Sequence, residues 1–167
     1  MKAMILAAGY GKRMMPLTEN LPKPLLKIGN KSLIERNINA LLAAGFSDII
    51  INVSYLGSMI KKHVLEIFPN ANISFSEEEI PLGTGGGVLN AIGLLGKDPF
   101  LLINADIYHQ INLKDLEQDV DIAHLVGVEN PDHNADGDFS LNSNVVSIKN
   151  NLNECTWSGI SIINPII

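Results

Sequence analysis

Residues 3–18 read Ala3-Met4-Ile5-Leu6-Ala7-Ala8-Gly9-Tyr10-Gly11-Lys12-Arg13-Met14-Met15-Pro16-Leu17-Thr18, and Pro22-Lys23-Pro24 follows shortly after them. The apolar run at 3–6 is too short for a buried helix, so it predicts a buried strand. The glycines behind it let the backbone turn sharply, and consecutive backbone N–H groups in such a turn attract anions. Lys12, Arg13 and Lys23 add positive charge, and the planar guanidinium of an arginine matches phosphate oxygens. Residues 7–18, called the phosphate loop below, are therefore predicted to bind nucleotide phosphates.

Three other interpretations of this loop compete. A Rossmann dinucleotide turn would need a third glycine where Met14 stands and an acidic residue after a second strand, whereas Glu35 falls in a predicted helix. A P-loop would need Gly-Lys-Ser/Thr at its end, which is absent. An ordinary surface loop with solvated charges would explain a lone Gly-x-Gly. The joint occurrence of the strand, Gly-x-Gly, Lys-Arg and Pro-Lys-Pro favours phosphate binding.

The composition indicates one globular domain. The chain has 167 residues, of which 46% are hydrophobic, and this is enough for a sizeable core. The formal net charge of −6 argues against nucleic-acid binding and makes the N-terminal Lys/Arg cluster stand out as a site for a small anion. No apolar run reaches membrane-spanning length and no secretory pattern is present, so we expect a cytoplasmic protein that contacts no membrane. The single cysteine, Cys155, excludes an internal disulfide and a multi-cysteine metal site.

Apolar segments alternate with amphipathic segments along the first 128 residues. Strands are predicted at 3–6, 49–53, 73–75, 100–103 and 122–128, and helices between Ser32 and Gly45 and at 59–68, 88–95 and 113–118. Strands that are apolar on both faces predict an α/β fold with a parallel sheet that is covered on both sides. Ligands bind such folds outside the carboxyl ends of the strands, where the phosphate loop, Asn52 and residues 104–106 fall. The pattern does not reveal the order of the strands.

The pattern changes after Val128. A polar segment at 129–138 and short strands at 138–141, 145–148 and 157–163 predict an insertion with antiparallel strands. Residues 132–138 imitate the start of an EF-hand loop, but Ser143 stands in place of its last ligand and no helices flank it, so calcium is excluded. The histidines have no metal-ligand spacing and are predicted to be structural: His63, His109, His124 and His133.

The pattern Leu6-Ala7-Ala8-Gly9-x-Gly11-x-Arg13-Met14-x-Pro16-Leu17-Thr18, followed by Pro22-Lys23-Pro24, resembles the signature of the sugar-1-phosphate nucleotidyltransferases. The resemblance implies a reaction of a nucleoside triphosphate with a sugar 1-phosphate, which gives a nucleotide-sugar and pyrophosphate. It implies a Rossmann-like, GT-A-like three-layer α/β fold with a mostly parallel central sheet. It also implies that residues 1–167 form a single nucleotidyltransferase domain without the family's C-terminal segment, which usually carries a second metal carboxylate.

Nucleotidyl transfer needs little covalent chemistry from a protein. The attacking sugar phosphate is already an anion, so the requirements are basic side chains, backbone N–H groups and a divalent cation. Mg²⁺ is held by one or two carboxylates together with phosphate oxygens. Asp106 follows a buried strand, and from the residues alone it is either such a ligand or a cap of the next turn. The resemblance implies that Asp106 binds the metal, that Arg13 binds the triphosphate, and that Lys23 binds the α-phosphate and the sugar phosphate.

The remaining expected site residues fall into two groups. The glycine-rich run at 83–87 is a flexible turn or a phosphate site at a helix N-terminus, and the resemblance implies instead that it holds the nucleobase. Glu78 or Glu79 either accepts a hydrogen bond from the base or belongs to a solvated turn. The expected nucleotide-binding residues are Ala7, Ala8, Gly9, Gly11, Lys12, Arg13, Lys23, Asn52, Gly83, Thr84 and Gly85. The expected sugar-binding residues are Asn104, Asp138, Ser158 and Gly159.

A narrower resemblance runs along nearly the whole chain. Residues 124–126, 130–133 and 137–139, and the Pro81-Leu82 pair before the glycine run, look like the bacterial N-acetylmuramate-1-phosphate uridylyltransferases of peptidoglycan recycling. The expected substrates are therefore UTP and N-acetylmuramate 1-phosphate. Mannose-1-phosphate guanylyltransferases share much of this pattern and are the alternative. A non-catalytic nucleotide-sugar sensor is a second alternative, a dinucleotide dehydrogenase is disfavoured, and the sequence carries no signal for an oligomeric state.

Overall fold

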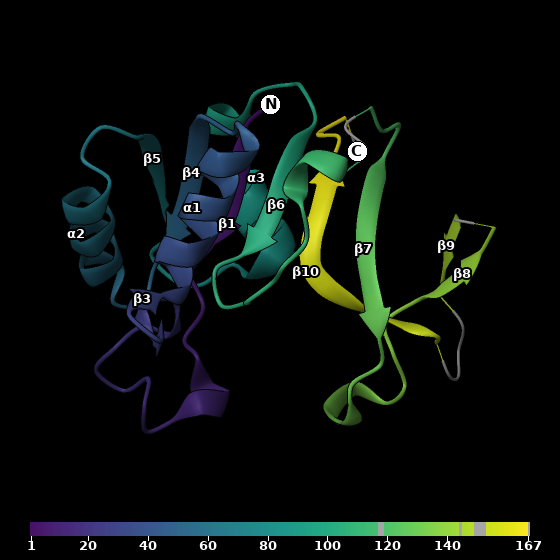
Figure 1. Cartoon of the computed structure of the whole chain (residues 1–167), viewed down its shortest axis with the longest axis horizontal. Helices are drawn as coiled ribbons and strands as arrows, with labels where there is room; N and C mark the ends of the chain where they lie inside the picture. The colour runs from purple at the N-terminus through teal and green to yellow at the C-terminus, as the bar shows by residue number, and fades with distance from the viewer. Residues whose placement is uncertain (117–118, 144, 149–152, 167) are drawn as a thin grey trace.

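The computed structural model describes residues 1–116, 119–143, 145–148 and 153–166. Its centre is a six-stranded sheet (Figure 1). In spatial order the strands are β5 (Asn72–Glu77), β4 (Asp48–Val53), β1 (Ala3–Leu6), β6 (Phe100–Asn104), β10 (Cys155–Ile163) and β7 (Ala123–Glu129). The first four strands are parallel, and β10 runs antiparallel to both of its neighbours. The predicted α/β fold with a mostly parallel sheet is confirmed.

Helices cover both faces of the sheet. The helices are α1 (Leu33–Ala44), α2 (Gly57–Ile67) and α3 (Gly83–Leu95), and Figure 1 shows α1 in front of the sheet and α3 behind it. Alternate residues of β1 point to opposite faces, as in any strand: Ile5 packs in the same cluster as Ile38 of α1, and Met4 in the same cluster as Ala91 of α3. The result is a three-layer arrangement whose two cores meet at the parallel strands.

The ends of α1 agree with the sequence signals. The Ser32 hydroxyl accepts a hydrogen bond from the Glu35 N–H at 3.2 Å, and Gly45 ends the helix in a left-handed conformation with φ of 94°. A serine cap satisfies one of the N–H groups that have no partner inside the helix, and glycine adopts the left-handed cap without a steric cost.

The structure corrects the prediction for α3, which begins at Gly83 rather than near Val88. Glycine weakens helices in isolation, but tertiary packing overrides this preference. A Cβ atom on Gly87 would lie 2.7 Å from the Asn52 Nδ2 and 2.9 Å from a Glu78 carboxylate oxygen. Gly87 therefore lets α3 approach these two buried polar groups closely.

The structure also corrects the prediction that the residues after Val128 form an insertion. The predicted segment at 157–163 is not confined to an insertion, because β10 lies inside the central sheet between β6 and β7. Among the described residues after Val128, β8 (Ser140–Asn142) and β9 (Val145–Ser147) form an antiparallel pair outside the central sheet. The predicted helix at 113–118 is observed as the short 3₁₀ helix η3 (Leu113–Asp115), and Gln118 lies outside the described residues.

The remaining elements are short and were not predicted: the 3₁₀ helices η1 (Lys12–Met14), η2 (Lys23–Leu25) and η4 (Asp132–Asn134), and the strands β2 (Lys27–Ile28) and β3 (Lys31–Ser32). In the described part of the chain, no helix has the length and apolarity needed to cross a membrane.

The connections of the sheet create a crevice beside β1. From β1 the chain moves through α1 to β4 and then to β5, and it returns through α3 to β6 on the other side of β1. The segments that leave β1 and β6 therefore diverge at the same edge of the sheet. Such a switch point is the place where α/β folds bind ligands, and the expected site residues at the ends of β1, β4 and β6 meet there.

Candidate active site

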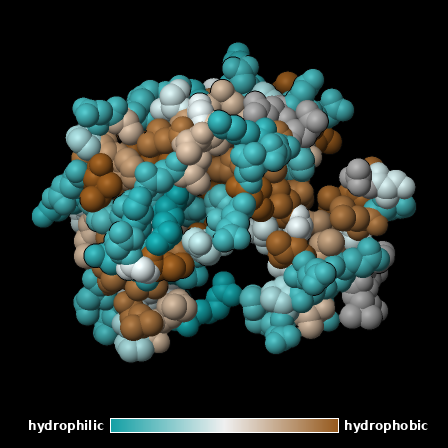
Figure 2. Space-filling model, in the orientation of Figure 1, coloured by the Kyte–Doolittle hydropathy of each residue, from teal (hydrophilic) through white to brown (hydrophobic). Residues whose placement is uncertain are grey.

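A cavity of about 480 Å³ opens at this edge. Figure 2 shows a notch in the lower edge of the molecule, which is the edge where β6 ends in Figure 1. The cavity is lined by all three expected catalytic residues and by every expected nucleotide-binding residue except Gly85: Ala7, Ala8, Gly9, Gly11, Lys12, Arg13, Lys23, Asn52, Gly83, Thr84 and Asp106. Asn104, from the expected sugar-binding group, lines it too.

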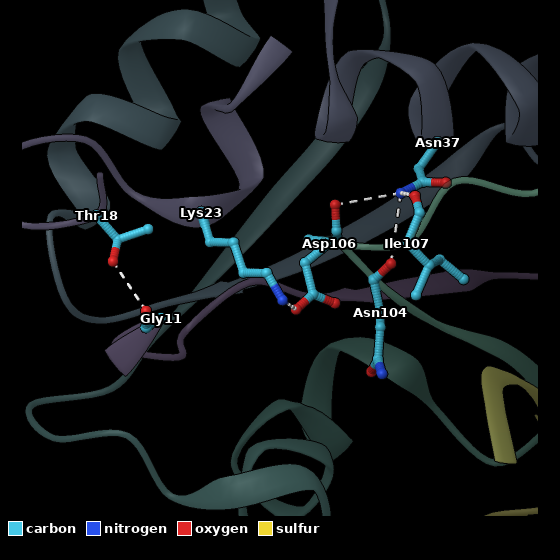
Figure 3. A network of polar contacts seen from close by, with 8 residues as sticks. Gly11, Thr18, Lys23, Asn37, Asn104, Asp106 and Ile107 are labelled. Atoms are coloured by element: carbon cyan, nitrogen blue, oxygen red, sulfur yellow. Dashed lines mark hydrogen bonds and ion pairs between the residues drawn. The ribbon is translucent and has the colours of Figure 1, made fainter. Parts of the chain in front are cut away.

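A hydrogen bond between Gly11 and Thr18 joins two parts of the phosphate loop. Gly11 has a left-handed φ of 64°, and its carbonyl accepts a hydrogen bond from the hydroxyl of the fully buried Thr18 at 2.8 Å (Figure 3). A Cβ atom at this position would lie 3.1 Å from the Thr18 Cγ2 and 3.3 Å from the Lys23 Cβ. Glycine is therefore required both by the backbone angle and by the space between two parts of the site.

Replacing Gly11 by alanine is expected to destabilise the chain by about 1–2 kcal/mol, the cost of a left-handed L-residue. Urea unfolding measures the change. The matched control is Gly9→Ala, because a Cβ atom on Gly9 would meet nothing within 4 Å and Gly9 has no positive φ. Equal losses of stability in the two variants would contradict the role assigned to Gly11.

Lys23 and Asp106 form an ion pair across the cavity. The Lys23 Nζ lies 2.5 Å from the Asp106 Oδ2, and Figure 3 shows the two side chains pointing toward each other from η2 and from the turn after β6. Asn37 of α1 holds that turn, because its Nδ2 lies 3.3 Å from the carbonyl oxygens of both Ala105 and Ile107. The helix that packs on this edge of the sheet thus fixes the backbone that carries the expected metal ligand.

The two cations of the phosphate loop, Lys12 and Arg13, are exposed. Arg13 belongs to η1 and makes no ion pair within the described part of the chain. The Lys12 Nζ lies 5.2 Å from the centroid of the Tyr10 ring, and this ring packs against Tyr55 with centroids 5.4 Å apart. The guanidinium of Arg13 is therefore available to a ligand, whereas Lys12 already has a partner for its charge.

The donor set at the cavity fits Mg²⁺ bound together with a substrate. Among the described residues that line the cavity, Asp106 is the one carboxylate. No cluster of three or more His, Cys, Asp or Glu side chains occurs among the residues that the structure describes. Mg²⁺ retains water and uses one or two carboxylates plus substrate phosphates, so it needs no complete protein cage.

His63 and His109 are not among the described residues that line the cavity. The His63 Nε2 lies 3.0 Å from the Ser32 hydroxyl, at the start of α1. His109 lies beyond the turn that carries Asp106, and burial lowers its pKa because the charged ring would lose solvation.

The structure corrects one of the two interpretations of Glu78. Glu78 does not lie in a solvated turn, because it is 7% exposed. Its carboxylate accepts hydrogen bonds from the Asn52 side chain at 2.6 Å and from the Leu82 N–H at 2.8 Å. Asn52 in turn accepts a hydrogen bond from the Ala7 N–H at 2.7 Å. Only the position of Glu78 after a strand, at the same sheet edge as Asn52, could have indicated this contact.

Of the expected sugar-binding residues, Asn104 lines the cavity and the other three do not among the described residues. Gly159 has a φ of 87°, and a Cβ atom on it would lie 2.7 Å from the Asn104 Nδ2. Gly159 therefore packs against the side chain of Asn104, which lines the cavity. The Ser158 hydroxyl accepts a hydrogen bond from the Ile160 N–H at 3.2 Å. The Asp138 carboxylate accepts one from the Trp157 N–H at 2.8 Å. Asp138, Ser158 and Gly159 do not line the cavity in the described part of the chain.

Comparisons with known proteins agree with this arrangement. Residues 2–126 match the nucleotidyl transferase family. The chain is 43% identical over 175 residues to the N-acetylmuramate alpha-1-phosphate uridylyltransferase of Neisseria meningitidis serogroup B, an alignment that covers 99% of this chain and 76% of the relative. It is 43% identical over 122 residues to the mannose-1-phosphate guanyltransferase of Schizosaccharomyces pombe, where 70% of this chain and 33% of the relative are covered.

A solved structure extends the likeness to the fold. The crystal structure of HddC from Yersinia pseudotuberculosis complexed with GMP-PN superposes with a TM-score of 0.81 at 29% identity, covering 98% of this chain and 76% of that one. This likeness confirms the predicted Rossmann-like nucleotidyltransferase fold. The family match over most of the chain, and the identity to a relative along nearly all of it, show that the chain belongs to the nucleotidyl transferase family, within the sugar-1-phosphate nucleotidyltransferases.

Proposed function

We propose that the chain transfers UMP from UTP to N-acetylmuramate 1-phosphate and releases pyrophosphate. The observation that carries this proposal is the convergence of the phosphate loop, Arg13, Lys23 and Asp106 on one cavity at the switch point of the sheet. Because nucleoside triphosphates are kept in the cytoplasm, the reaction suits a cytoplasmic protein. The substrates are small anions, in keeping with a local positive cluster on an acidic chain.

The proposed chemistry is an in-line displacement at the α-phosphorus. An oxygen of the sugar phosphate attacks, the bond from the α-phosphorus to the bridging oxygen breaks, and the electron pair leaves with pyrophosphate. Arg13 stabilises the negative charge that develops on the pyrophosphate. Lys23 holds the α-phosphate next to the incoming sugar phosphate, where two anions would otherwise repel each other. No general base is required, because the nucleophile is already ionised.

Asp106 would hold Mg²⁺ together with phosphate oxygens of the nucleotide. A bound Mg²⁺ would neutralise part of the charge of the triphosphate. The Lys23 Nζ lies 2.5 Å from the Asp106 carboxylate. The residue that would hold the metal and the residue proposed to hold the phosphates are therefore next to each other.

The start of α3 suits a nucleobase better than a phosphate. The N-terminus of a helix attracts anions through its unpaired N–H groups. Here the Leu82 N–H already donates to the buried carboxylate of Glu78 at 2.8 Å, and a second anion would meet the charge of the first. The neighbouring Gly83 and Thr84 line the cavity. We therefore assign the uracil to the side of the cavity formed by these two residues.

The choice of UTP and the muramyl sugar is supported by the similarity to the Neisseria relative along nearly the whole chain. The guanyltransferase relatives match a shorter part, and they make GTP with mannose 1-phosphate the competing pair. Both pairs require the same mechanism, since the base and the sugar lie at opposite ends of the reacting phosphates.

The test measures pyrophosphate release with Mg²⁺ while UTP, GTP, CTP and dTTP are crossed with the 1-phosphates of N-acetylmuramate, N-acetylglucosamine, glucose and mannose. The expected result is one dominant signal for UTP with N-acetylmuramate 1-phosphate. A dominant signal for GTP with mannose 1-phosphate would contradict the substrate assignment and keep the mechanism. Nucleotide binding without release in any combination would contradict the enzyme and favour a sensor.

A further inference from the structure

One side chain outside the cavity contacts the chain on both sides of the cations of the phosphate loop. The ring of Tyr55 packs against the ring of Tyr10, with centroids 5.4 Å apart and planes inclined by 51°. The Tyr55 hydroxyl donates a hydrogen bond at 2.7 Å to the carbonyl oxygen of Glu19, which directly follows the loop. Tyr55 is not among the described residues that line the cavity, whereas Tyr10 is. Tyr55 therefore joins the two arms of the loop from outside the cavity.

The part of the loop between these two contacts has little packing of its own. Residues 12–17, which include Lys12 and Arg13, are all exposed. The hydrogen bond from the Thr18 hydroxyl to the Gly11 carbonyl lies inside the loop (Figure 3). Segments with few buried contacts open locally at a low cost in free energy. The positions of the two cations therefore depend on how the arms on either side of them are held.

The segment that carries Tyr55 is well anchored. It lies between β4 and α2, where Val53 is 2% exposed and Ile60 is fully buried. A Cβ atom on Gly57 would lie 3.1 Å from the Val53 Cβ, so the start of α2 packs directly against the end of β4. Leu56 has a left-handed φ of 52°, a conformation that costs free energy in a residue with a side chain and persists only where its surroundings enforce it. Tyr55 thus has a fixed support.

We propose that Tyr55 is a positioning residue that holds the phosphate loop in the shape that receives the triphosphate. The aromatic pair and the hydrogen bond order the loop before a ligand arrives, so less conformational entropy is lost on binding. The inference rests on the proposed function, in which this loop binds the triphosphate. Because Tyr55 acts on the loop and not on the base, its effect should be the same for every ligand that carries the triphosphate group.

The test removes the contacts of Tyr55 one at a time. Tyr55→Phe keeps the ring pair and loses the hydrogen bond to Glu19, whereas Tyr55→Leu loses both contacts. Tyr10→Leu removes the other ring of the pair. The matched control is Tyr108→Leu, because the ring of this third tyrosine lies near the Arg36 guanidinium and is not among the described residues that line the cavity.

Equilibrium titration with UTP, GTP and inorganic tripolyphosphate measures affinity without turnover. We expect Tyr55→Leu to weaken binding of tripolyphosphate and of the tighter-binding nucleotide by a similar factor of about ten, as the loss of an aromatic pair and a hydrogen bond predicts. Tyr55→Phe should weaken both by about threefold. The double variant Tyr10→Leu/Tyr55→Leu should bind about as well as Tyr55→Leu, because the two rings act as a pair. Tyr108→Leu should change none of the affinities.

Trypsin measures the order of the loop separately from affinity. It cleaves after lysine and arginine, and Lys12 and Arg13 are both exposed. Without ligand, mass spectrometry should detect cleavage at these two positions at least about threefold faster in Tyr55→Leu than in the original chain, as expected for a less ordered segment. Cleavage after the exposed Lys97, which follows α3, is the internal reference and should keep its rate.

Three results would overturn the proposal. The first is unchanged affinity in a folded Tyr55→Leu variant, which would leave Tyr55 with a structural role alone. The second is a loss of affinity in Tyr10→Leu that Tyr55→Leu does not share, which would mean that Tyr10 contacts the ligand itself. The third is a loss of nucleotide affinity in Tyr55→Leu without a loss of tripolyphosphate affinity, which would place the effect at the base.

Two further outcomes remain distinguishable from these. If Tyr55→Leu fails to fold, Tyr55→Phe replaces it, and unchanged affinity together with unchanged trypsin cleavage in that variant would also overturn the proposal. An original chain that binds neither a nucleotide nor tripolyphosphate would contradict the proposed function, and this inference with it. Because no turnover is measured, the titrations decide the role of Tyr55 even if the chain transfers no nucleotidyl group.

Discussion

Arg13→Ala is expected to lower the rate of pyrophosphate release at saturating substrate by about 10²–10³-fold, the usual effect of removing one group that stabilises charge in a transition state. The same change should leave thermal unfolding unaltered. Arg13 is exposed in η1 and makes no ion pair with the described residues, so its removal costs no packing. Steady-state kinetics and a thermal unfolding curve on the same preparation separate the two effects.

Lys12→Ala is the control for this prediction. It removes the neighbouring charge, but the Lys12 ammonium already lies over the Tyr10 ring at 5.2 Å from its centroid. We expect a change in rate of less than about tenfold, since a cation held by a ring is less available to the transition state. A folded Arg13→Ala variant that turns over as fast as the original chain would remove Arg13 from the mechanism.

Asp106→Asn is expected to raise the Mg²⁺ concentration for half-maximal rate by at least about tenfold, because an amide is a much poorer ligand for a hard cation than a carboxylate. The loss of the ion pair with Lys23 should cost at most about 1 kcal/mol, since both side chains are partly exposed. The Mg²⁺ titration of the rate is complemented by Mn²⁺ binding in the presence of nucleotide, measured by electron paramagnetic resonance.

Asp138→Asn serves as the matched carboxylate. Asp138 accepts hydrogen bonds from the Trp157 N–H and the Asn134 side chain, and it is not among the described residues of the cavity lining. Its substitution should leave the Mg²⁺ titration unchanged. If Asp106→Asn likewise leaves both the titration and Mn²⁺ binding unchanged, Asp106 is a cap of its turn and not a metal ligand.

Local signals in the sequence predicted the part of the fold that holds the site. The β1 strand and the ends of α1 at Ser32 and Gly45 depend on neighbouring residues, and these elements appear where expected. The rule that ligands bind at the carboxyl ends of parallel strands then placed Asn52 and Asp106 at one edge. Their positions needed no knowledge of the strand order, because every parallel strand ends at the same edge.

Contacts between distant segments could not be predicted in this way. The periodicity of β10 predicted a strand but not its partners, and pairing with β6 depends on residues far away in the chain. The ion pair of Lys23 with Asp106 joins positions separated by 83 residues. The burial of Glu78 similarly depends on its contacts with Asn52 of β4 and with Leu82 at the start of α3. The acidic run alone left a base contact and a solvated turn open.

Following both ends of the triphosphate in one reaction decides whether the chain is a nucleotidyltransferase. UTP labelled at the α-phosphorus in one sample and at the γ-phosphorus in another is incubated with Mg²⁺, with and without N-acetylmuramate 1-phosphate. We predict that the α-label moves into the nucleotide-sugar and the γ-label into pyrophosphate, in equal amounts and only when the sugar phosphate is present. An α-label that stays in UTP at saturating sugar phosphate, or that appears in UMP or UDP without it, would contradict nucleotidyl transfer.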